Sequence, residues 1–209
     1  SYRVWKQEAK KQGLDIPTHL ICCYPNEPGF VQGMANLTLE AYNRAKEAGK
    51  PRILFSAHGL PIRMIRRGDP YHAQVEMSCH RVMEAMGLDK ETTDWKICFQ
   101  SKVGPLKWLE PDTEDEIEQA GHDGVPLVLV PIAFVSEHSE TLVELDIEYG
   151  EIAEEAGVPV YERVPTINAR MTYIDSLAEQ VRASLNVDTE IAAYNGKRLC
   201  SGDRKRCPC

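Results

Sequence analysis

The sequence lacks any apolar stretch close to the roughly 20 residues that a membrane-spanning helix needs. It also lacks an excess of positive charge: 24 Lys and Arg against 32 Asp and Glu give a net charge of −8, which argues against nucleic acid as the main partner. It has no starting Met and no signal-like segment, so we expect Ser1 to be a cut or processed end. Repeats and low-complexity segments are absent too. The remaining composition, 209 residues of which 43% are hydrophobic, is typical of a soluble globular protein.

The chain is not short of cysteine, but its seven cysteines are unevenly placed. Cys79 and Cys98 stand alone within regular segments and are expected to be buried, inert thiols. The other five form an adjacent pair and a C-terminal group: Cys22, Cys23, Cys200, Cys207 and Cys209. Since nothing else suggests a secreted disulfide scaffold, we expect a cytosolic, reducing compartment and a metal site.

Strand and helix patterns alternate along the chain. Expected strands occupy residues 19–24, 52–56, 95–100, 127–130 and 158–164. Expected helices occupy residues 2–12, 30–48, 70–86 and 113–120, a segment that begins near residue 137 and ends near residue 157, and residues 172–185. This alternation predicts an α/β fold: a doubly wound, mostly parallel sheet flanked by helices, with a short cysteine-rich C-terminal tail.

Two strand ends carry the ionisable residues that could do chemistry. The buried strand at 127–130 leads into Glu137, His138 and Glu140, and the strand at 52–56 leads into His58. In open α/β sheets, ligands bind beyond the carboxyl ends of the strands, so we expect these side chains to share one crevice. His58 could be a histidine that is simply hydrogen-bonded at a strand end. It could also accept protons or coordinate a divalent metal.

Acidic residues continue along the helix that follows. Steps of three and four place five carboxylates on one helical face: Glu137, Glu140, Glu144, Glu148 and Glu151. The helix dipole explains acidic residues in the first turn but not the later ones, which repel one another. The row is either a solvated acidic face or a route for hydrated divalent cations.

The C-terminal thiols are separated by basic residues, which favour thiolates and soft-metal binding. Cys200, Cys207 and Cys209 cannot complete a four-thiolate site, and Cys22 or Cys23 is the natural fourth ligand. Iron–sulfur and zinc both fit the ligand type. The alternative is an unstructured tail with incidental thiols.

Four motifs resemble ferrochelatase: SAHGLP at 56–61, RGDPY at 67–71, QSKVGPLKWL at 100–109 and PIAFVSEHSETLVELDIEY at 131–149. The similarity runs from about residue 17 to residue 185. It implies a fold of two similar α/β halves with a porphyrin between them, of which this chain resembles the second, type II chelatase-like and Rossmann-like half. Residues 1–16 then resemble the end of the first half or crossover helix, residues 17–186 the C-terminal domain, and residues 187–209 a linker and cluster-binding tail.

The resemblance implies an enzyme, a lyase of haem biosynthesis that inserts Fe2+ into protoporphyrin IX to give protohaem. By position, His58, Glu140 and His138 resemble the catalytic residues, and His58 and Glu140 would contact the Fe2+ substrate. Glu137, Glu144, Glu148 and Glu151 resemble a metal route, although the family often has aspartate where Glu137 stands. The residues that resemble pocket-lining positions are Ser56, Tyr71, Trp108 and Phe134.

The tail resembles that of bacterial ferrochelatases that hold a [2Fe–2S] cluster, with Cys200, Cys207, Cys209 and either Cys23 or Cys22 as ligands. The implied partners are porphyrin, ferrous iron and the missing N-terminal half of the enzyme. The implied location is the cytoplasm, with peripheral association at the inner-membrane surface as a further option. Coproporphyrin ferrochelatase or another tetrapyrrole metal chelatase is the alternative. A more distant one is a non-catalytic iron–sulfur sensing module, which would leave the pairing of His58 with Glu140 unexplained.

Overall fold

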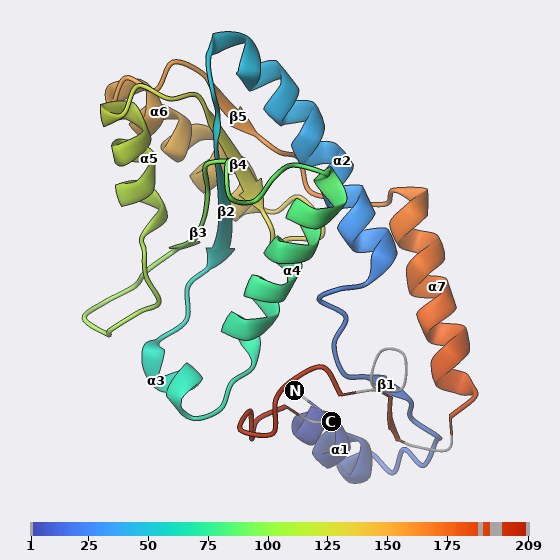
Figure 1. Ribbon diagram of the computed structural model, residues 1–209. Coiled ribbons are helices and arrows are strands. Elements are labelled where there is room, and N and C mark those ends of the chain that lie inside the picture. The colour runs from blue at the N-terminus through green and yellow to red at the C-terminus, as the bar shows by residue number, and fades with distance from the viewer. Residues whose placement is uncertain (1, 188–189, 193–197, 208–209) are drawn as a thin grey trace.

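Four apolar segments form a parallel sheet in the computed structural model, which describes residues 2–187, 190–192 and 198–207 (Figure 1). The strands are β2 (Arg52–His58), β3 (Trp95–Gln100), β4 (Leu127–Pro131) and β5 (Tyr161–Arg163), arranged in the order β3-β2-β4-β5. All three neighbouring pairs are parallel. The central strands β2 and β4 are buried almost throughout, which explains their unbroken apolar sequence.

Helices cover both faces of this sheet (Figure 1). On one face lie α2 (Pro28–Ala45), α4 (Tyr71–Met86) and α7 (Met171–Leu185), packed with Ile53 and Phe55 of β2. On the other face lie α5 (Thr113–His122) and α6 (Tyr149–Glu155), packed with Leu54 of the same strand. Successive side chains of a strand point to opposite faces, so β2 contributes to two cores. The predicted doubly wound α/β fold is confirmed.

Local signals set the helix ends. The Glu27 carboxylate caps α2 by accepting hydrogen bonds from the backbone N–H groups of Gly29 (3.0 Å) and Phe30 (2.7 Å). Asp112 caps α5 in a similar way. α4 ends at Gly87, whose φ of 68° is a left-handed conformation that favours glycine.

The strand order reverses between β2 and β4. The chain leaves β2 through α4 on one face to reach β3, and it leaves β3 through α5 on the other face to reach β4. The carboxyl ends of β2 and β4 therefore flank a topological switch point, where open α/β sheets bind ligands. His58 ends one of these strands and Pro131 ends the other.

The two ends of the chain meet outside the main sheet. The strand expected at 19–24 shortens to β1 (Leu20–Ile21), which pairs in parallel with β6 (Ile191–Ala192) in a separate two-stranded sheet. β6 lies in a segment expected to be only a linker. The first helix, α1 (Tyr2–Lys11), lies beside the C-terminal segment (Figure 1), and Lys6 Nζ contacts Glu190 Oε2 at 2.8 Å.

Three short or unusual helices complete the described ranges. They are the 3-10 turn η1 (Lys46–Ala48), α3 (Ile62–Arg66) within the basic loop expected to be irregular, and the π-helix η2 (Glu140–Glu148). None of the helices in the described ranges combines the length and apolar character needed to cross a bilayer.

Candidate active site

His58 stands at the carboxyl end of β2, with its side chain 42% exposed. Its Nδ1 lies 2.9 Å from the carbonyl oxygen of Gly59. Because a carbonyl oxygen can only accept a hydrogen bond, Nδ1 carries the proton in this contact, and Nε2 is then the basic nitrogen. The imidazole is thus oriented with its basic atom away from the backbone.

The residues around His58 form a close-packed floor. A side chain at Gly59 would place its Cβ 2.9 Å from the backbone oxygen of Gln100 and 3.4 Å from Trp108, so only glycine fits there. The Tyr71 hydroxyl donates to the backbone oxygen of His58 at 2.9 Å. Tyr71 and Trp108, both predicted to line the pocket, therefore touch the His58–Gly59 turn, and both are half-buried.

Glu140, the first residue of η2, comes to the same place after the loop that follows β4. Its Oε2 lies 3.9 Å from His58 Nε2, and its backbone N–H donates to Nδ1 of His138. The His138 ring in turn stacks on Phe134, with ring centroids 6.2 Å apart. The structure therefore brings together the three residues expected to be catalytic, with Phe134 beside them.

The separation of His58 and Glu140 has a chemical consequence. A planar ring between them would need about 7 Å, twice a van der Waals contact of ~3.5 Å, whereas the two atoms are 3.9 Å apart. Both side chains are more than a third exposed, at 42% and 35%, so each has room to rotate toward solvent. A macrocycle that enters between them must first part the pair.

Three members of the acidic row, Glu140, Glu144 and Glu148, lie in the π-helix η2, whose i→i+5 bonding widens the turn, while Glu137 precedes this helix and Glu151 lies in α6. Glu144 is anchored in η2: Ser101 donates to both of its oxygens, at 2.9 and 2.8 Å, and Gln100 and Tyr149 donate at 3.2 Å. Burial and the Glu144 charge raise the pKa of the Tyr149 hydroxyl, which keeps it a donor. Glu148 and Glu151 are exposed.

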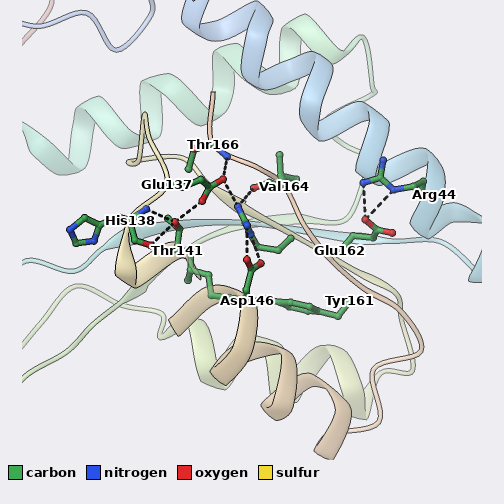
Figure 2. A network of polar contacts seen from close by, with 11 residues as sticks. Arg44, Glu137, His138, Thr141, Asp146, Tyr161, Glu162, Val164 and Thr166 are labelled. Atoms are coloured by element: carbon green, nitrogen blue, oxygen red, sulfur yellow. Dashed lines mark hydrogen bonds and ion pairs between the residues drawn. The ribbon is translucent and has the colours of Figure 1, made fainter. Parts of the chain in front are cut away.

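Glu137, expected on the metal route, is held by protein groups (Figure 2). Its Oε1 accepts from Arg163 Nη1 at 2.9 Å and from the Thr166 N–H at 3.0 Å, and its Oε2 accepts from the Thr141 hydroxyl at 2.6 Å. Burial raises the pKa of Glu137, but these hydrogen bonds and the Arg163 charge outweigh it, and the pKa is lowered overall. The carboxylate is therefore ionised and already occupied.

Ser56 lies below the site rather than on its surface. It is fully buried, and its hydroxyl donates to Gln100 Oε1 at 2.8 Å and lies 3.0 Å from the Thr113 hydroxyl. These bonds tie β2 to β3 and to the start of α5, two residues before His58.

Four of the cysteines expected to hold a cluster lie near one another: Cys22, Cys23, Cys200 and Cys207. Cys22 Sγ lies 3.7 Å from Cys207 Sγ, and Gln74 of α4 donates to Cys200 Sγ at 3.5 Å. Burial and the neighbouring thiols raise the pKa of Cys23 and of Cys200. Cys209 lies outside the described residues. Within the described ranges, no three metal-ligand side chains converge on one point.

Cys79 and Cys98 behave as expected for packing residues. Both are fully buried, and burial raises the pKa of each thiol, in the case of Cys98 to about 12.

Sequence reasoning missed the groups that hold the acidic row. Arg163 lies within the strand expected at 158–164 and Ser101 within the motif at 100–109, and the sequence pattern assigned neither of them a carboxylate partner. Ser101 has a φ of 61°, an uncommon left-handed value for a residue other than glycine, and donates to Glu144. Nothing local in the sequence signals either contact, because both partners come from distant segments.

A sequence model of the family described as Ferrochelatase matches residues 1–185. The chain is 49% identical over 175 residues to a ferrochelatase of Wolbachia sp. subsp. Drosophila simulans (strain wRi), covering 84% of this chain and 54% of that protein. It is 46% identical over 209 residues to a ferrochelatase of Phenylobacterium zucineum (strain HLK1), covering 100% and 59%. The Caulobacter vibrioides (strain NA1000 / CB15N) ferrochelatase is 42% identical over 210 residues, covering 100% and 58%.

The chain thus spans between half and three-fifths of the length of these relatives. A solved structure described as "SirB from Bacillus subtilis with Fe3+" overlaps 74% of this chain and 56% of its own, at a TM-score of 0.46 and 16% identity.

Proposed function

Because this chain belongs to the ferrochelatase family, we propose that it forms one wall of an active site that inserts Fe2+ into protoporphyrin IX to give protohaem. The observation that carries this proposal is the approach of Glu140 Oε2 to His58 Nε2, 3.9 Å apart at the switch point of the sheet. A proton acceptor and an oxygen ligand at one point are what metallation of a porphyrin requires.

The chemistry assigns a role to each side chain. Insertion of Fe2+ releases two pyrrole protons. His58 Nε2, left basic by the bond between Nδ1 and Gly59, accepts the first, passes it to solvent from its partly exposed ring, and then accepts the second. The Glu140 carboxylate supplies an oxygen ligand that replaces water on the incoming Fe2+. His138, stacked on Phe134, lies alongside and presents a second imidazole. Tyr71 and Trp108 hold the His58–Gly59 turn from below.

The acidic row is proposed as the metal route, with its members in unequal roles. Glu148 and Glu151 are exposed and would exchange hydrated Fe2+ with solvent. Glu144 lies between them and Glu140 and is fixed by Ser101, so it is pre-oriented. Glu137 contributes charge at the start of the row, but its oxygens are engaged by Arg163, Thr141 and Thr166.

The test is a metallation assay on the intact protein. Fe2+ under anaerobic conditions should convert protoporphyrin to protohaem, followed by the loss of porphyrin fluorescence. Coproporphyrin is assayed in parallel, and a preference for it would replace the proposed substrate with the alternative one. Visible absorbance of a cluster together with no metallation of either porphyrin would favour the non-catalytic iron–sulfur module.

The thiols fit a [2Fe–2S] cluster by their chemistry, since four of them lie near one another: Cys22 contacts Cys207, and these two thiols are among the groups that raise the pKa of Cys23 and of Cys200. We propose Cys200, Cys207 and Cys209 as ligands, with Cys22 rather than Cys23 as the fourth because of its 3.7 Å contact with Cys207. The group would supply a one-electron redox centre when bound. Cys22→Ser should then bleach the visible spectrum while Cys23→Ser retains it; the reverse result would exchange the two roles.

We also propose a cytoplasmic protein that associates with the inner-membrane surface. A cavity of about 170 Å³ beside α3 is lined by apolar and basic residues: Pro61, Ile62, Arg63, Arg66, Leu106 and Lys107. Such a mixture suits an anionic, amphipathic surface. Sedimentation with anionic vesicles, compared with neutral ones, tests the association.

A further inference from the structure

One arginine on β5 holds two carboxylates that belong to the wall of the active site (Figure 2). Arg163 Nε and Nη2 donate to the two oxygens of Asp146 at 2.5 and 2.6 Å, while its Nη1 donates to Glu137 at 2.9 Å. The Arg163 side chain is only 11% exposed. All three guanidinium nitrogens are thus engaged by partners from two different segments.

These two partners lie on either side of Glu140 in the chain. Glu137 belongs to the loop before the π-helix, and Asp146 lies within the helix. The link continues inward from Glu137: its Oε2 accepts from the Thr141 hydroxyl at 2.6 Å, and Thr141 Oγ1 accepts from the His138 N–H at 2.8 Å. The backbone that carries His138 and Glu140 is therefore held at both ends by one side chain.

β5 contributes a second attachment next to the first. Tyr161 lies two residues before Arg163, and its hydroxyl donates to the Leu145 backbone oxygen at 2.6 Å. Leu145 precedes Asp146 in the π-helix. A π-helix is rare and less favourable than an α-helix, so its persistence here requires attachments from outside, and β5 supplies them.

We propose that Arg163 is a positioning residue for the reaction. By binding Glu137 and Asp146 together, its guanidinium fixes the π-helix so that Glu140 lies opposite His58. The inference rests on the proposed function, since it matters for catalysis only if Glu140 acts on Fe2+. A planar guanidinium fork can serve two carboxylates in this way, whereas a lysine ammonium can serve them only as a point charge.

A matched control is an arginine on another element that contacts the same strand. Arg44 of α2 donates to Glu162 at 2.8 Å, so it also joins β5 to a neighbouring element, but the pair faces away from the site (Figure 2). In the intact protein, Arg163→Gln should lower kcat for iron insertion roughly 10- to 100-fold, as a displaced catalytic group does. KM for porphyrin should change little, Arg163→Lys should recover part of the loss, and Arg44→Gln should stay within about twofold of the parent. Equal activity of the two glutamine variants would overturn the proposal.

Two further measurements separate positioning from general destabilisation. In a Glu140→Gln background, Arg163→Gln should cost less than about twofold, because the group it positions has already been removed. The same fold loss in both backgrounds would contradict the inference. Amide hydrogen exchange over residues 138–148 should speed up in Arg163→Gln and not in Arg44→Gln.

The exchange measurement does not depend on catalysis. If the parent protein fails to metallate porphyrin, the proposed function falls, and the exchange experiment still decides whether Arg163 anchors the π-helix. Unchanged exchange in Arg163→Gln would refute the anchoring even in an active enzyme.

Discussion

Both ends of the parallel sheet carry an arginine bound to two carboxylates, but the two clusters differ in what lies beside them. At the amino end, Arg52 donates to Asp94 and Asp123, each at 2.9 Å, with its side chain 10% exposed. At the carboxyl end, Arg163 donates to Glu137 and Asp146 with 11% exposure. Each end also has a histidine beside a carboxylate, but at the carboxyl end His58 ends a strand and faces Glu140 from a half-exposed position, whereas at the amino end His122 is 84% exposed beside Asp123.

The difference shows that an ion cluster does not by itself mark a site. Arg52 joins the loop before β3 to the end of α5, so its contacts close the fold at the amino edge of the sheet. Arg163 also binds two carboxylates, but these partners, Glu137 and Asp146, lie on either side of Glu140 in the chain. What distinguishes the carboxyl end is a partly exposed ionisable pair, His58 and Glu140, at the switch point of the sheet. The polar side chains around this pair are already hydrogen-bonded to other protein groups.

The largest expected effect is on iron insertion, and it comes from replacing the histidine at one end of the sheet but not the histidine at the other end. His58→Ala should lower iron insertion by roughly 10²- to 10⁴-fold, the usual contribution of a general base, and the half-exposed side chain predicts little change in stability. His122, at the end of α5 beside Asp123, is 84% exposed and is the matched control. His122→Ala should retain activity, as measured by steady-state metallation. Comparable losses in both variants would show that the two ends do not differ in this way.

A smaller effect should appear in stability at the amino end. Arg52→Met removes charge-assisted hydrogen bonds to two partly exposed aspartates, and we expect unfolding to become easier by about 2–3 kcal/mol. Arg44→Met breaks an exposed pair and should cost less than about 1 kcal/mol. Denaturant midpoints followed by circular dichroism measure both. If Arg52→Met lost no more unfolding free energy than Arg44→Met, the structural role assigned to Arg52 would be wrong.

The smallest effect is a dependence of stability on acid, and it involves both ends. The hydrogen bond from Arg52 is the main reason that the pKa of Asp123 is lowered. The pKa of Glu137 is also lowered, although its burial acts in the opposite direction. A carboxyl group whose native pKa is depressed stabilises the fold above its unfolded pKa of about 4. This stabilisation is lost as the pH falls through the native pKa. Unfolding free energies measured between about pH 5.5 and pH 3 should therefore decline on acidification.

Single variants assign that decline to one end or the other. Asp123→Asn should flatten it through the amino end, and Glu137→Gln through the carboxyl end. A slope unchanged in both variants would mean that other carboxylates carry the acid dependence.

The sequence predicted the sheet well because its central strands are buried on both faces. Continuous apolar runs at β2 and β4 give clear boundaries, and alternation with helices fixes the parallel arrangement. The same logic predicted that His58 and Glu140 would meet, since both follow strands beside the switch point. β1 and β6 were harder to predict, because two residues on each strand carry no detectable periodicity.

The details of the site wall were beyond local reasoning. Buried residues recur every four positions along the π-helix and into α6, at Thr141, Leu145 and Tyr149, a spacing that fits an α-helix equally well. The helix was therefore predicted, but its widened turn was not. Arg163 lies 17 residues from Asp146 and 26 from Glu137, so only the folded chain reveals the pairing.

The contact between Cys22 and Cys207 closes a loop between residues 185 apart in sequence, and the pairing of β1 with β6 closes nearly the same loop. Closing such a loop costs about 5 kcal/mol of chain entropy, but the cost arises only once. Whichever contact forms first bears it, and the second then forms between ends that are already together. Docking of the tail should therefore be cooperative, so that a change at either contact loosens both.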